Sequence, residues 1–144
     1  MTSRFLLMSK LLELQMWETD SPLKQFGFFG NDILGKLEAK NLSVEKLREM
    51  DHREIGAMIR NPKYGKIVQN KAFEIPLLKL ESVLQPITRT VLRIRLKISA
   101  DFKWNDKVHG KTTEPFWIWI EDPNSNFIYH SEYFLITKKQ VILV

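Results

Sequence analysis

Four basic residues in one short segment are the best candidates for chemistry in this sequence: Arg60, Lys63, Lys66 and Lys71. No acidic residue lies among them. On a helix, Lys63 and Lys66 share a face because they are three residues apart, and Lys71 lies near that face. Their ammonium groups, with the free backbone amides at the helix start near Asn61, suit a phosphate group. The segment indicates contact with a nucleic-acid backbone, although a solvated helix face gives the same pattern.

A second set of basic residues follows in the chain: Arg89, Arg93, Arg95 and Lys97. The last three recur with a period of two, which is the pattern of the exposed face of a strand. This stripe therefore has a structural explanation and adds little to the case for nucleic acid.

Three tryptophans could serve as stacking platforms for bases: Trp104, Trp117 and Trp119. Such residues more often fill the core of a β-sandwich. We favour the core.

The only segment that resembles a catalytic motif lacks a residue that the chemistry needs. Residues 30–36 match G-x-x-x-x-G-K, the start of a phosphate-binding loop. Leu37 replaces the Ser or Thr whose hydroxyl would hold a magnesium ion. Ile33, Leu34 and Leu37 are also needed as the apolar face of a helix. We therefore predict no nucleotide site here.

The titratable residues form no other constellation. The histidines do not have the spacing of metal ligands: His52, His109 and His130. We interpret the first as a surface residue, the second as a loop residue and the third as a strand-face residue. Two pairs of carboxylates lie in turns or helix starts: Glu49 with Asp51, and Glu121 with Asp122. With no cysteine in the chain, we predict no catalytic residue, no metal and no cofactor.

The elements that position these residues change character near residue 76. Before it, apolar residues follow helical periods. Ser43 and Asp51 are expected to cap helices, and Asn61-Pro62 to end one helix and begin the next. The predicted helical segments are residues 1–15, a helix start at 21–22, and residues 31–41, 43–50, 51–59 and 61–73. These helices are too short to be stable alone and must pack together.

After residue 76 the pattern alternates, which predicts strands. Leu78, Leu80 and Val83 are expected to point one way. Residues 92–98 read as a strand with a buried and a wet face. Residues 114–121 and 127–134 flank a Pro/Asn turn and read as a hairpin. With the last segment, residues 135–144, this makes about five strands.

Composition limits the class of protein. The 144 residues are 44% hydrophobic and 27% charged, as in a globular chain. No apolar run is long enough to span a bilayer, so no membrane interaction is expected. The absence of cysteine favours the nucleus and cytoplasm over secretion. The net charge of +5 is a moderate bias towards polyanions.

Several long motifs make the chain similar to a known unit. They are residues 41–50 (NLSVEKLREM), 54–62 (EIGAMIRNP), 85–93 (QPITRTVLR), 101–104 (DFKW), 108–110 (VHG), 114–118 (EPFWI) and 130–134 (HSEYF). These resemble the Sec homology unit, which follows each helicase cassette in Ski-like DExH nucleic-acid helicases. The resemblance covers about residues 10–139.

The resemblance implies an α+β fold: a small all-α helix-loop-helix unit followed by an immunoglobulin-like antiparallel β-sandwich. It implies three parts: residues 1–25 as the end of a helical bundle, 26–75 as the helix-loop-helix domain and 76–144 as the sandwich. In such helicases the bundle lines the nucleic-acid channel and the helix-loop-helix can contact the emerging strand. The sandwich packs on the helicase core or binds other subunits of the complex. None of these parts hydrolyses ATP.

We therefore expect a non-catalytic accessory module of a helicase, with a stand-alone nucleic-acid-binding module using residues 60–71 as the alternative. In the whole helicase, the resemblance implies ATP-driven strand separation in DNA repair, transcription coactivation or ribosome rescue. About five strands fall short of the seven of an immunoglobulin-type sandwich. The sandwich should be incomplete, so we expect Trp117, Trp119 or residues 141–144 to be exposed or to pair with another chain. Self-association through that surface is a further expectation.

Overall fold

The computed structural model describes residues 2–142. The chain divides into two compact units. One contains the first 73 residues together with Pro115–Leu135, and the other contains Glu74–Glu114 together with the residues from Ile136 onward. None of the helices in the described part of the chain has both the length and the apolar character that a bilayer crossing requires.

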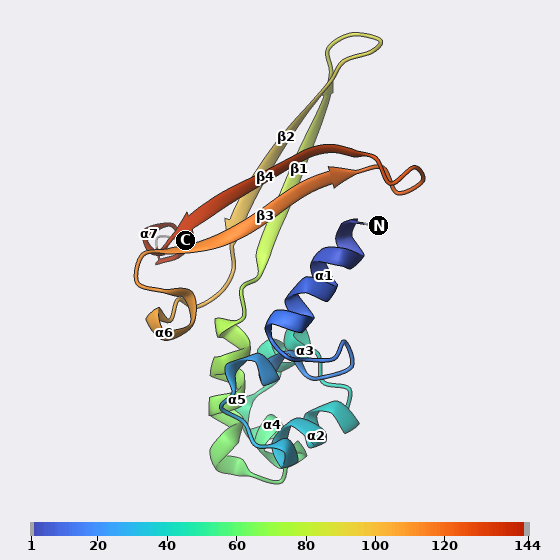
Figure 1. Ribbon diagram of the computed structural model, residues 1–144. Helices are drawn as coiled ribbons and strands as arrows, with labels where there is room; N and C mark the ends of the chain where they lie inside the picture. Colours follow the sequence, from blue (N-terminus) through green and yellow to red (C-terminus); the bar gives the residue numbers. More distant parts are fainter. Residues whose placement is uncertain (1, 143–144) are drawn as a thin grey trace. The chain divides into compact units, whose positions relative to one another are not determined.

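The first half of the chain is helical, as the periodicity predicts (Figure 1). Its elements are α1 (Thr2–Glu13), the 3-10 helix η1 (Pro22–Phe26), α2 (Asn31–Ala39), α3 (Val44–Glu49), α4 (His52–Met58) and α5 (Pro62–Glu74). Two of the predicted caps are confirmed. The Ser43 hydroxyl accepts a hydrogen bond from the Lys46 amide at 3.3 Å, and the Asp51 carboxylate accepts one from the Arg53 amide at 2.8 Å. These bonds satisfy amides that a helix start leaves unpaired.

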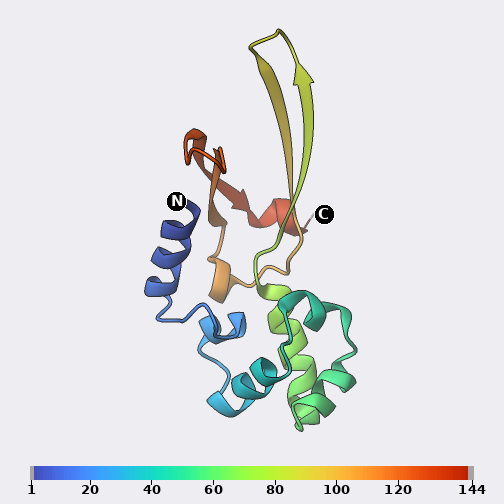
Figure 2. The ribbon, with the colours of Figure 1, turned by 90° about the vertical axis from the view of Figure 1, so that its right-hand side faces the viewer.

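Helices α2 to α5 lie side by side around one apolar core (Figures 1 and 2). Each contributes fully or nearly fully buried side chains, among them Leu37, Leu47, Ile55 and Val68. Polar bonds also join the helices: the Arg48 side chain donates to the carbonyl of Ala72 at 3.0 Å, and Gln69 donates to that of Met50 at 2.6 Å. Short helices that cannot persist alone are thus held by shared burial.

The second half of the chain forms two antiparallel hairpins. Strand β1 (Leu78–Pro86) pairs with β2 (Leu92–Ala100), and β3 (Thr113–Glu121) pairs with β4 (Ile128–Thr137). The short helix α6 (Asp106–His109) lies between the hairpins in sequence, and α7 (Lys138–Ile142) follows β4. The fold is α+β, with a helical unit followed by part of a β-sandwich.

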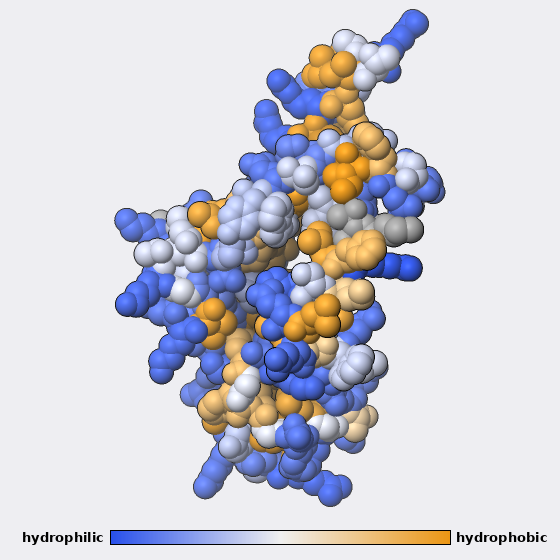
Figure 3. Space-filling view, in the orientation of Figure 1, coloured by the Kyte–Doolittle hydropathy of each residue, from blue (hydrophilic) through white to orange (hydrophobic). Residues whose placement is uncertain are grey.

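The apolar face of the β1–β2 hairpin is exposed over most of its length. Register places Leu84 opposite Ile94, and Leu80 opposite Ile98, on one face. Leu80, Leu84, Leu92 and Ile94 are all exposed, Leu84 by 62%, and Figure 3 shows hydrophobic atoms on the surface of this hairpin. The prediction of a buried face is wrong here, because a two-stranded sheet has no second layer of its own to cover it.

Register also corrects the predicted direction of Val83. This residue lies opposite Arg95, on the face that carries the basic residues. Leu78 and Leu80 are an even number of residues apart and do share a face, whereas Val83 is an odd number away.

The β3–β4 hairpin carries paired aromatic rings. Phe116 stacks on Phe134 at 5.8 Å between ring centroids, and Trp117 meets Tyr133 edge-on at 5.1 Å. Trp117 is 61% exposed, so the favoured placement of this tryptophan in a core is wrong, whereas its expected exposure on an incomplete sandwich is confirmed. Trp119 is only half-buried.

The segment after β4 is not the fifth strand that its apolar residues suggest. Residues 138–142 form α7, while residues 143–144 lie outside the described residues. The reason is local: the Gln140 side chain accepts a hydrogen bond from the Thr137 amide at 2.8 Å, and the Thr137 hydroxyl accepts one from the Gln140 amide at 3.4 Å. This reciprocal pair is a capping box, which starts a helix.

Candidate nucleic-acid interface

The junction between α4 and α5 is a helix-ending turn centred on Arg60. Arg60 has a φ of 54°, in the left-handed region that usually belongs to glycine. Its amide bonds to the Ala57 carbonyl at 3.1 Å, and the Asn61 amide bonds to the Gly56 carbonyl at 2.9 Å. These two bonds form a Schellman motif, which ends α4 and lets α5 begin two residues later.

Two glycines allow α4 and α5 to approach closely. A Cβ atom on Gly65 would overlap the His52 carbonyl oxygen and would lie 2.9 Å from the amide nitrogen of Gly56. A Cβ atom on Gly56 would lie 2.9 Å from the Cα of Pro62. Real Cβ atoms do not come so near, so backbone-to-backbone contact fixes how the helices cross.

Lys63 and Lys66 lie on the outward face of α5. The buried residues of the helix are Gly65, Val68 and Ala72. At about 100° of rotation per residue, Lys63 lies opposite that buried face and Lys66 lies about 60° from Lys63. Both lysines and Arg60 are exposed. Among the described residues, no carboxylate forms an ion pair with any of these three, so their charges are available to an anion.

Lys71 differs from the other predicted site residues. It is half-buried, and its ammonium nitrogen lies 5.2 Å from the centre of the Phe26 ring, a cation–π contact inside the helical unit. Helical geometry places it about 80° from Lys63, on the opposite side from Lys66. Its proposed role in binding remains a prediction, with a structural role already visible.

The segment that resembles a phosphate-binding loop forms helix α2 and contributes to the helical core. Gly30 and Asn31 lie at the start of α2, and Ile33, Leu34 and Leu37 are buried in the helical core. Leu37, at the position where the motif needs a hydroxyl, is 0% exposed. Within residues 2–142, no group of three or more acidic or histidine side chains gathers in a way that could hold a metal ion.

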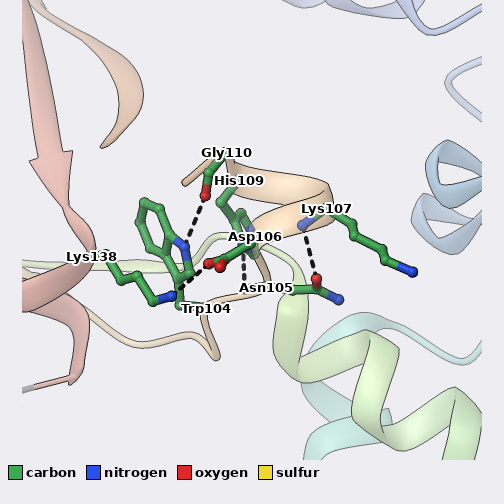
Figure 4. A network of polar contacts seen from close by, with 7 residues as sticks. All are labelled: Trp104, Asn105, Asp106, Lys107, His109, Gly110 and Lys138. Carbon is green, nitrogen blue, oxygen red and sulfur yellow. Dashed lines mark hydrogen bonds and ion pairs between the residues drawn. The ribbon is translucent and has the colours of Figure 1, made fainter. Parts of the chain in front are cut away.

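The loop between β2 and β3 is a compact network that sequence reasoning missed (Figure 4). Its centre is His109, interpreted from sequence as a loop residue, but only 2% exposed. The His109 ring packs 5.0 Å from that of Phe102 and 5.4 Å from that of Trp104, measured between centroids. The Trp104 indole donates to the Gly110 carbonyl at 3.0 Å. This tryptophan is therefore engaged within the loop and is not a free stacking platform.

An ion pair joins this loop to the start of α7. The Lys138 ammonium lies 2.7 Å from the Asp106 carboxylate. The hydrogen bond from Lys138 holds the pKa of Asp106 below its usual value. The signal in the sequence was present: the motifs at 101–104 and 108–110 contain the residues of this network, but only the structure shows that they meet.

Comparison with known proteins assigns the family. The Sec63 Brl domain family matches residues 1–143. The chain belongs to the Sec63 Brl domain family. This Brl domain is 51% identical to activating signal cointegrator 1 complex subunit 3 of Gallus gallus and 50% identical to that of Homo sapiens, in each case over 99% of the chain and 6% of the relative. It is 42% identical to the U5 small nuclear ribonucleoprotein 200 kDa helicase of Homo sapiens, over 96% of the chain and 6% of the relative.

The Brl domain thus spans about 6% of the length of these relatives. It corresponds to an accessory, helicase-associated region and not to a catalytic core. The resemblance drawn from the motifs is confirmed at the level of the family.

Proposed function

We propose that this chain acts as a non-catalytic accessory module of a nucleic-acid helicase of the activating signal cointegrator 1 complex type. The observation that carries the proposal is the match of nearly the whole chain to one segment of those relatives. Its partners would be the helicase core or other subunits of the cointegrator complex, in the nucleus and cytoplasm. The processes served by the whole protein would be DNA repair, transcription coactivation or ribosome quality control.

Replacement within a relative tests this role. The corresponding segment of a cointegrator-complex subunit 3 is exchanged for this chain, and ATP-dependent strand separation is measured against the unaltered protein and a version lacking the segment. We expect the exchange to retain unwinding that the deletion loses. Unwinding that is equally absent from the exchanged and the deleted proteins, with both shown to fold, would contradict the proposal. The isolated chain should hydrolyse no ATP.

Within that role, the outward face of α5 would contact a nucleic-acid strand. Arg60, Lys63 and Lys66 carry exposed charges without acidic partners among the described residues, and the glycine contact with α4 fixes the direction of the two lysines. The same face supports the second candidate function, a stand-alone nucleic-acid-binding module in which Lys71 also takes part.

A salt titration of binding to a labelled single-stranded oligonucleotide tests the α5 face. The double variant Lys63→Gln/Lys66→Gln should make the negative slope of log affinity against log salt shallower by about 1.4, at about 0.7 per lost phosphate contact. The matched control is Lys24→Gln/Lys36→Gln, which removes the same charge from lysines already paired with Asp20 at 2.6 Å and Asp32 at 2.7 Å. Equal losses in both variants would show an effect of net charge only. Tight binding by the isolated chain would favour the stand-alone function.

A further inference from the structure

The polar face of the β1–β2 hairpin is divided into a half with paired charges and a half without. In the half nearest the loop to α5, Lys97 lies opposite Glu81, with 3.1 Å between ammonium and carboxylate. On the same face, the Lys79 ammonium lies 3.1 Å from the carboxylate of Asp101. These lysines are neutralised by neighbours within the same unit.

The half of the hairpin nearest its turn has no such compensation. Arg93 lies opposite Gln85, and Arg95 lies opposite Val83. Residues 82–96 contain three arginines, Arg89 in the turn being the third, and no acidic residue. All three arginines are exposed. Across the described part of the chain, none of the three forms an ion pair with a carboxylate. The period of two explains why Arg93 and Arg95 share a face. It does not explain why residues 82–96 contain no acidic residue.

The spacing of these arginines suits a repeating anion. Two residues of strand advance by about 6.8 Å, which is the rise of two stacked nucleotides at about 3.4 Å each. A guanidinium group presents a planar fork that bonds two phosphate oxygens at once. Because strand pairing places Arg93 and Arg95 on one face, their forks would meet alternate phosphates of one strand.

We propose that the turn half of the β1–β2 hairpin binds the phosphate backbone of a nucleic-acid strand through Arg89, Arg93 and Arg95. This surface is additional to the outward face of α5 and does not require that face to bind. The hairpin uses only its polar face for this contact, because the opposite face presents Leu84, Leu92 and Ile94. Two-stranded ribbons are an established means of contacting nucleic acid.

The test uses the full chain and a fluorescent oligothymidylate, with affinity measured by anisotropy over a range of salt concentrations. Arg93→Gln/Arg95→Gln should make the negative slope of log affinity against log salt shallower by about 1.4. Lys79→Gln/Lys97→Gln is the matched control, because it removes two charges from the same face of the same hairpin but from the paired half. The control should change the slope by much less. Circular dichroism of each variant checks that the exposed substitutions leave the fold intact.

Three outcomes would overturn the proposal. They are an unchanged slope in Arg93→Gln/Arg95→Gln, equal losses in that variant and its control, or equal binding of polyglutamate of matched charge, which would indicate an acidic protein as the partner. The lysine variant of α5 is titrated in parallel. A loss confined to the α5 variant would refute the hairpin surface alone, and a loss confined to the arginine variant would refute the α5 face alone.

Discussion

The Nε2 atom of His109 lies 2.7 Å from the backbone carbonyl oxygen of Glu74, the last residue of α5. The other ring nitrogen, Nδ1, accepts a hydrogen bond from the Asn105 amide at 3.0 Å. Since Nδ1 accepts, the ring proton belongs on Nε2, which donates to Glu74. One buried side chain thus satisfies two backbone groups that are 31 residues apart in sequence.

Replacing His109 by Ala should destabilise the protein markedly. The change removes the His109 hydrogen bonds to the Asn105 amide and the Glu74 carbonyl and empties a buried site between aromatic rings. Because lost hydrogen bonds cost about 1 kcal/mol each and a cavity adds to that cost, we expect a loss of about 3 kcal/mol in the free energy of unfolding, measured by urea denaturation. The control is His130→Ala, at an exposed position, which should change stability by less than about 0.5 kcal/mol. Similar effects of both substitutions would contradict the structural role of His109.

Gly65→Ala should disrupt the packing of α4 against α5. The new methyl group would overlap the His52 carbonyl oxygen, and forced overpacking usually costs about 1–3 kcal/mol or more. Gly35→Ala provides the opposite case, because a Cβ there meets nothing within 4 Å. In the middle of α2 that substitution should stabilise the protein by about 0.5–1 kcal/mol. Thermal unfolding of both variants checks the pair, and a tolerated Gly65→Ala would show that the helices separate easily.

Arg60→Gly separates the stability of the α4–α5 junction from its charge. The left-handed conformation costs a side-chain-bearing residue about 1 kcal/mol or more, and glycine adopts it freely. We expect unchanged or slightly greater thermal stability together with weaker binding to an oligonucleotide. A clear loss of stability would mean that the arginine side chain supports the turn in a way that its backbone bonds do not explain.

The ion pair between Lys138 and Asp106 should depend on pH only in acid. Because Lys138 lowers the folded-state pKa of Asp106 below 3.8, the contact contributes fully above that value and is lost as the pH falls through the folded pKa. In Lys138→Gln, the pKa of Asp106 should rise towards 3.8, as measured by carboxyl carbon chemical shifts in an NMR titration. An Asp106 pKa that does not respond to the substitution would contradict the contact.

Local signals predicted most of the helical half. Ser43 and Asp51 cap helices in the structure because a cap depends on residues only two or three positions away. Two predictions fail for reasons that are also local. Val83 is an odd number of residues from Leu80, so the alternation of one strand already assigns it to the opposite face. The apolar residues after β4 conceal the capping box of Thr137 and Gln140.

The candidate site was predictable only in part. The spacing of Lys63 and Lys66 placed them together on one helix face, since both belong to one regular element. The contact of Lys71 with Phe26 could not be predicted, because the two residues are distant in sequence. The same holds for the ion pairs that Lys79 and Lys97 form in one half of the hairpin. The burial of His109 was hidden for the same reason.

The contact between Gly56 and Gly65 also prevents α5 from rotating about its own axis against α4. Turning α5 about its own axis by one position would bring a side chain in place of Gly65 against the backbone of α4. Lys63 lies about 200° around the helix from Gly65. The close approach at Gly65 therefore sets the direction in which Lys63 points. The orientation of the charged face is therefore determined by Gly65, which has no side chain. A substitution at Gly65 would change the direction of Lys63 and Lys66 without altering either lysine.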